Sequence, residues 1–195
     1  MESFEQLCQK RRSVRKYKSQ PIEQEKIDYM LRCALMSPSA KRTIPWEFVV
    51  VRDEAKVRAL SVCKTYGSQM FDTATAAIII ALDPTLCHNT WMADGAIAAE
   101  HILLAAAEQG VGACWCHIHE RGKVVTGDGL PVTGDGLPVT GEEDRGGAAK
   151  YVRELLGIPE KYEVLCAIAL GYPDEEKSAY DLDRLKYEKI HNEEW

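Results

Sequence analysis

Two uninterrupted apolar runs place the strongest constraint on how this chain can fold. "AAIIIAL" (76–82) and "VLCAIAL" (164–170) have the length of strands and carry no charged side chain. Neighbouring side chains of a strand point to opposite faces of its sheet, so both faces of these strands are apolar. Such strands need a covering layer on each side. Together with a third predicted strand, "WEFVVV" (46–51), they predict a sheet enclosed between two layers.

Segments with helical periodicity can supply these layers. In residues 22–37, apolar side chains recur at the spacing of an amphipathic helix. Residues 93–110 predict an Ala-rich helix that is apolar around most of its circumference, and therefore buried inside the domain or in a subunit interface. Shorter helices are predicted at 3–10, where a capping box begins at Ser3, and at 148–157.

The overall composition is that of one globular domain. The chain has 195 residues, of which 46% are hydrophobic. The N-terminal stretch has no apolar region of a secretory signal, and no run approaches the ~18 apolar residues of a membrane span. Seven cysteines, an odd number, are typical of reduced thiols. We therefore expect a soluble cytoplasmic protein with no membrane partner.

A basic run, "KRRSVRKYK" (10–18), puts six cationic side chains into nine positions of a chain whose net charge is −6. Because the rest of the chain is strongly acidic, we expect no nucleic-acid partner. Like charges about 6 Å apart repel by roughly 3 kcal/mol at an effective dielectric of about 20, unless an anion lies among them. Arg11, Ser13 and Arg15 share one face of an extended segment and suit a phosphate. The alternative is a solvated basic face.

The string "CWCHIH" (114–119) contains four side chains that could bind a metal. On a strand, which we predict at 112–119, Cys114 and Cys116 point to one face and the two histidines to the other. One tetrahedral site cannot use all four without a sharp turn, so buried thiols are the favoured interpretation. A metal-binding module that combines one pair with distant ligands stays an alternative.

Two segments stand outside this core pattern. Within residues 120–146 the unit VTGDGLP occurs twice and begins a third time, which predicts a Gly/Asp/Pro repeat loop. Its Asp-Gly pairs do not have the ligand spacing of an EF-hand calcium loop. Residues 173–195 form a polar tail with no periodic core of its own, and we expect it to pack on a partner subunit.

Four motifs together resemble the FMN-dependent nitroreductase family. They are "RRSVRKY", "SPSAKRTIPWEFVVV", "GVGACWC" and the "GYP…EKIH" ending, and the resemblance covers nearly the whole chain apart from residues 120–146. It implies one α+β domain over residues 1–195 with a central mixed or antiparallel sheet sandwiched by helices. It also implies an intertwined homodimer with FMN at the interface, around which the tail wraps.

The resemblance also implies which residues hold the flavin. The phosphate and ribityl chain are assigned to Arg11, Arg12, Ser13 and Arg15, with Arg15 also reaching the ring. The strand that lies along the ring near N5 is assigned to Cys114, Trp115, Cys116 and His117. The other subunit contributes the loop residues Pro38, Ser39 and Ala40, and Arg184 lies near the phosphate, with Lys177 as a weaker alternative.

At four positions the chain departs from the family pattern or matches it loosely. Arg42 and Ile44 stand where relatives often have Asn and Gln, and His117 stands where many have Gly. Arg42 remains a candidate flavin contact, as does Gln69, which lies where relatives place polar flavin contacts.

The function implied by the resemblance is that of an NAD(P)H-dependent FMN oxidoreductase. Hydride passes through flavin N5 in a ping-pong reaction to a small electron-poor acceptor such as a nitroaromatic or a quinone. The flavin carries the chemistry, so no catalytic side chain and no metal are expected. The alternatives are a flavoprotein of the same fold with another reductive task, such as flavin reduction or removal of a substituent, and the metal-binding module.

Overall fold

The computed structural model describes residues 3–87, 89–122 and 146–195 of the chain, so the VTGDGLP repeat lies outside the described residues. Its helices and strands follow one another in this order: α1 (Phe4–Lys10), α2 (Gln24–Leu35), β1 (Trp46–Val51), α3 (Glu54–Ala59), β2 (Ala76–Leu82), α4 (Trp91–Glu108), β3 (Gly112–His117), α5 (Gly147–Leu156) and β4 (Glu163–Gly171). Within this described part no helix combines the length and the apolar character that a membrane crossing requires.

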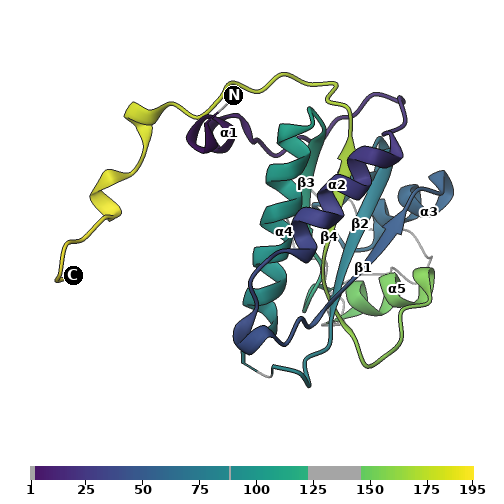
Figure 1. Cartoon of the computed structure of the whole chain (residues 1–195). Coiled ribbons are helices and arrows are strands. Elements are labelled where there is room, and N and C mark those ends of the chain that lie inside the picture. The colour runs from purple at the N-terminus through teal and green to yellow at the C-terminus, as the bar shows by residue number, and fades with distance from the viewer. Residues whose placement is uncertain (1–2, 88, 123–145) are drawn as a thin grey trace.

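The strands form one antiparallel sheet in the order β1-β2-β4-β3 (Figure 1). The predicted bounds of β1 and β2 are confirmed. The prediction for β3 was wrong at its end, because the strand stops at His117 and not at residue 119. There the backbone N–H groups of Ile118 and His119 both donate to the carbonyl of Leu165, which ends the regular ladder.

Helices cover both faces of the sheet, as the apolar runs require. Side chains of β2 alternate between two cores: Ile78 and Ile80 pack in one, and Ile79 in the other. The first core lies under α2 and α4, and the second contains buried side chains of α3 and α5. The predicted sheet sandwiched by helices is confirmed.

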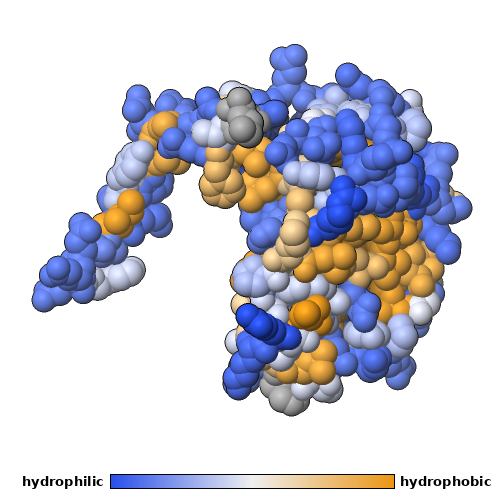
Figure 2. Space-filling view, in the orientation of Figure 1, coloured by the Kyte–Doolittle hydropathy of each residue, from blue (hydrophilic) through white to orange (hydrophobic). Residues whose placement is uncertain are grey.

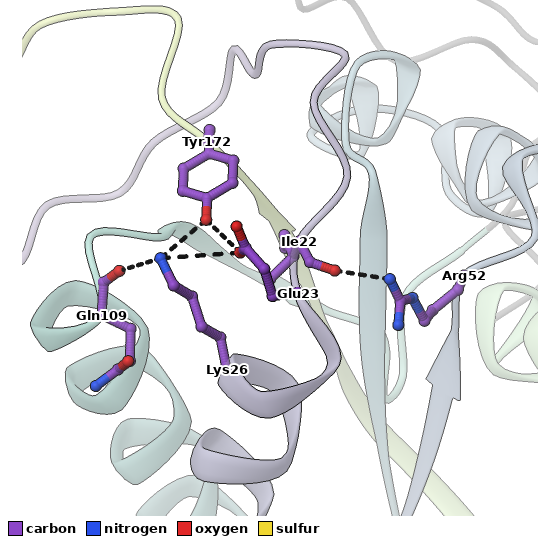
Figure 3. A network of polar contacts seen from close by, with 6 residues as sticks. All are labelled: Ile22, Glu23, Lys26, Arg52, Gln109 and Tyr172. Atoms are coloured by element: carbon purple, nitrogen blue, oxygen red, sulfur yellow. Dashed lines mark hydrogen bonds and ion pairs between the residues drawn. The ribbon is translucent and has the colours of Figure 1, made fainter.

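A polar network fixes the start of α2 against the sheet and α4 (Figure 3). Lys26 Nζ donates to the carbonyl oxygen of Gln109 at 3.0 Å and to Tyr172 Oη at 2.8 Å, and the Tyr172 hydroxyl donates to Glu23. Arg52 donates to the carbonyl of Ile22. The helix begins at Gln24, two residues inside the predicted segment.

The basic segment lies at the open edge of β3, and the first part of the tail lies along this segment. The basic segment pairs with this edge through a parallel bridge between Ser13 and Ala113. The tail that follows β4 returns across the same region, where the Tyr180 N–H donates to the carbonyl of Gln9, and then leaves the body of the molecule (Figure 1). Residues 178–195 are all exposed.

Candidate functional site

The basic segment lies beside the strand that the sequence assigns to the flavin ring. Val14 N–H donates to the carbonyl of Ala113 at 3.0 Å, next to the parallel bridge at Ser13. Close packing holds the segment there, because a Cβ at Gly112 would come within 2.9 Å of a Val14 methyl carbon. The structure thus brings the predicted phosphate residues and the predicted ring strand together.

Arg15 is oriented by its neighbours. Its backbone N–H donates to Glu175 Oε1 at 2.5 Å, and its guanidinium donates to the carbonyl of Ser13 at 3.4 Å. Burial raises the pKa of the Cys114 thiol, and the positive charge of Arg15 opposes this shift. The Arg15 guanidinium therefore acts on the face of β3 that carries Cys114. Glu175, which the sequence motifs did not identify, carries a lowered pKa because it accepts from Arg15 and Lys177.

Arg11 and Arg12 engage the tail of their own chain. The Arg12 guanidinium donates to the carbonyl of Ser178 and lies 4.6 Å from the centre of the Tyr180 ring. Arg11 donates to the Tyr180 hydroxyl at 3.5 Å and lies 3.9 Å from Glu100. These contacts give both arginines a structural role in holding the tail at the point where it leaves the body.

A pocket of about 220 Å³ opens between the basic segment, α4 and the start of β3. Its floor includes Gly112 and Ala113, and its charged lining residues are Lys10, Arg11, Arg12, Lys177 and Glu175. Four cations and a single carboxylate fit a phosphate group, which guanidinium and ammonium donors bind with charge-assisted hydrogen bonds. The residues present therefore fit the phosphate of a ligand such as FMN.

The side chains of β3 separate as expected for a strand. Cys114 and Cys116 are buried in the core beneath α3 and α5, whereas Trp115 and His117 stack on the other face, with ring centroids 6.3 Å apart. The pKa of Cys116 is lowered, chiefly by a hydrogen bond from Cys63. Among the described residues no three His, Cys, Asp or Glu side chains converge as metal ligands.

The loop with Pro38, Ser39 and Ala40 is held by a carboxylate of α4. Asp94, only 4% exposed, accepts the Ala40 N–H at 3.0 Å, and Ser39 Oγ accepts the Ile44 N–H at 3.1 Å. Ile44 has φ 48°, which is strained backbone for a β-branched residue. Asp94 was missed by the sequence reasoning, although it is a lone acidic side chain in the first turn of an apolar helix.

The remaining residues predicted to contact the flavin do not lie at the basic pocket of the same chain. Asp94, which holds the loop, is 13 residues from Ala107 in the basic pocket, or about 20 Å along α4. Arg42 is exposed in this loop. Arg184 lies in the exposed tail, in η4 (Leu182–Arg184). Gln69, in η3 (Gln69–Asp72), is nearer to β3, because it accepts from Gly67, whose carbonyl oxygen is 3.6 Å from Cys116 Sγ.

A second pocket, of about 280 Å³, lies at the other end of β3. Its lining includes Lys64, Tyr66, His117, Glu120 and Arg121. Burial lowers the pKa of His117 below its ordinary 6.5, and Arg121, His119 and Lys64 lower it further. The sequence did not place Lys64 or Arg121 here, because they belong to segments that no motif covers.

Comparison with known proteins agrees with this geometry. A model of the nitroreductase family matches residues 8–66 and 63–172. The chain belongs to the nitroreductase family. A protein of Archaeoglobus fulgidus, provisionally named NADH dehydrogenase/NAD(P)H nitroreductase, is 36% identical over 199 residues, with 100% of both chains covered.

Solved structures of nitroreductases share the fold. An FMN-dependent nitroreductase from Clostridium difficile R20291 has a TM-score of 0.82 and 39% identity, and the match covers 97% of this chain and 98% of that one. An iodotyrosine deiodinase of Thermotoga neapolitana is 24% identical to this chain over 188 residues. The match covers 92% of this chain and 94% of the deiodinase. The predicted nitroreductase fold and the predicted enzyme class are confirmed.

Proposed function

We propose that this nitroreductase uses FMN and NAD(P)H to reduce small electron-poor acceptors such as nitroaromatics or quinones in a ping-pong reaction. The observation that carries the proposal is the cationic pocket at the start of β3, which lies beside the strand assigned to the ring. The similarity to an FMN-dependent nitroreductase along 97% of this chain supports it.

In this proposal the chain's own residues bind and orient the cofactor. Arg11, Arg12, Ser13 and Arg15 hold the phosphate and ribityl chain. Of these, Arg11 and Arg12 line the pocket, to which Lys10 and Lys177 add charge. When bound, FMN would supply the redox chemistry between NAD(P)H and the acceptor. Arg15 would stabilise negative charge on the ring. A cytoplasmic location and the absence of a nucleic-acid partner stay predictions.

We further propose a homodimer in which the tail crosses the partner subunit. The tail carries exposed apolar side chains at Leu182, Leu185, Tyr187, Ile190 and Trp195. Apolar surface also gathers on the body over α2 and β1 (Figure 2). In a dimer the loop of residues 38–40 and Arg184 can approach the flavin held by the other chain. Covering both apolar surfaces gives the association a hydrophobic driving force.

Absorption spectroscopy tests the cofactor and the electron donor together. We expect the purified protein to show flavin bands that bleach when NADH or NADPH is added without oxygen. Arg15→Ala should weaken FMN binding about tenfold or more and slow reduction, since a hydrogen bond to a charged group contributes about 1.5–3 kcal/mol. Lys18→Ala, in the same basic run, is the matched control. A colourless protein that FMN cannot reconstitute would refute the proposal.

The deiodinase relative favours a second candidate, the reductive removal of a ring substituent. Turnover of nitroaromatics and quinones should be compared with turnover of a halogenated phenol and with free FMN as acceptor. Turnover of nitroaromatics or quinones well above that of the halogenated phenol and of free FMN supports the first proposal, whereas halide release without nitro reduction supports the second.

A further inference from the structure

The pocket at the end of β3 is built from segments that tertiary contacts hold in place. Lys64 Nζ donates to the carbonyl of His117 at 3.2 Å, and Thr65 Oγ1 donates to the carbonyl of Gly122 at 3.4 Å. The Arg121 N–H donates to the carbonyl of Ile118, and the Arg121 carbonyl accepts from Ala148 at the start of α5. These bonds hold the Lys64 ammonium group against the end of β3 and fix the backbone from which Arg121 projects.

The pocket has a net positive charge in an otherwise acidic chain. Lys64 and Arg121 contribute two positive charges. Glu120, which also lines the pocket, contributes one negative charge; it is 82% exposed and its carboxylate lies 3.7 Å from His119. His117 adds no charge near neutral pH, because burial and the two nearby cations lower its pKa. An anionic group placed here would therefore be attracted, and it would lie against the strand assigned to the flavin ring.

We propose that Lys64 and Arg121 bind a negatively charged substituent of the electron acceptor, so that carboxylate-bearing aromatic acceptors are preferred to neutral ones. This inference rests on the proposed function, because the acceptor must lie beside the flavin. A volume of about 280 Å³ accommodates one substituted aromatic ring. The 2′-phosphate of NADPH offers the same anionic chemistry, and the experiment separates these two sources.

The first measurement is binding to the oxidised FMN-loaded enzyme. Benzoate and benzamide, which have similar shapes and accept no electrons, are titrated while the flavin spectrum is followed. We expect Arg121→Gln and Lys64→Gln each to weaken benzoate binding about fivefold and to leave benzamide unchanged. Added salt should weaken only benzoate binding, because exposed charges are screened. Lys56→Gln, an exposed cation of α3, is the matched control.

The second measurement is turnover of 4-nitrobenzoate and 4-nitrobenzamide with NADH and with NADPH. The two variants should lower kcat/KM for 4-nitrobenzoate about fivefold relative to 4-nitrobenzamide, with either donor. An unchanged ratio of kcat/KM for 4-nitrobenzoate to kcat/KM for 4-nitrobenzamide overturns the inference. If the variants change only the ratio of the activity with NADPH to the activity with NADH, the inference is also overturned, and the pocket is assigned to the phosphate of the donor. Loss of the proposed function itself would be distinct, since the protein would then lack flavin bands and reduce neither compound.

Discussion

At the scale of single residues, the pKa of His117 depends on the charged groups at the end of β3. The pKa of His117 lies below 6.5 through burial, Arg121, His119 and Lys64, while Glu120 raises it. Folded His117 therefore binds its proton less tightly than the unfolded chain does. This difference in proton binding favours the folded chain above pH 6.5. The contribution to the free energy of unfolding is lost as the pH falls through the folded-state pKa of His117.

We expect Arg121→Gln to raise the pKa of His117 toward 6.5, because it removes one of the cations that oppose protonation. The NMR shift of the His117 ring proton, followed against pH, measures this change. Lys56→Gln should leave the midpoint where it is in the parent protein. An unchanged midpoint in Arg121→Gln would show that the guanidinium does not act on this ring.

At the scale of elements, the position of the basic segment depends on a close approach to the end of β4. A Cβ at Gly171 would come 2.7 Å from Tyr17 Cβ and 2.8 Å from its ring atoms. Tyr17 is 4% exposed, and its hydroxyl donates to the carbonyl groups of Val14 and Ala169. The ring is thus fixed at both ends, so a larger residue at 171 has to displace the segment that carries Arg15.

We expect Gly171→Ala to lower the free energy of unfolding by about 1–3 kcal/mol, the usual cost of overpacking a filled site. FMN binding should weaken at the same time, because the basic segment moves. Thermal unfolding and FMN titration measure the two effects. If stability falls but FMN affinity does not, then the position of this segment is not what sets flavin binding.

At the scale of the whole molecule, the exposed apolar surface bears on the proposed homodimer. The tail beyond Tyr180 has no buried residue, yet it carries Leu182 and Trp195, and the body exposes Met36 and Ile44. Figure 2 shows this hydrophobic area on the side of the body turned to the viewer, with the tail extending to its left. A second copy that covers this area would bury both surfaces at once.

We therefore expect the full chain to sediment as a dimer and a chain lacking residues 181–195 to dissociate at the same concentration. The deletion keeps Ser178 and Tyr180, which hold Arg11 and Arg12, so the fold of each chain should survive. Circular dichroism is the control for folding. A full chain that sediments as a monomer, or a truncated chain that stays dimeric, would contradict the role given to the tail.

The sequence by itself determined the strands β1 and β2, the capped helix α1 and the family. These features depend on local patterns: alternation in a strand places side chains on both faces, and Ser3 and Gln6 cap α1 through a few bonds. The face separation of the Cys and His side chains in β3 follows from the same geometry. Local periodicity also explains the limits of prediction, since the end of β3 was set by bonds to Leu165 on another strand.

Only the tertiary structure decided which charged groups lie together. Hydrogen bonds join Glu175 to Arg15, Asp94 to Ala40, and Lys64 to His117. The partners are 160, 54 and 53 positions apart in the sequence. No spacing in the sequence encodes such pairs, because they depend on how β3, α4 and the loops pack around one sheet. The sequence fixes the residues that can bind an anion, and the packing of distant segments decides where those residues converge.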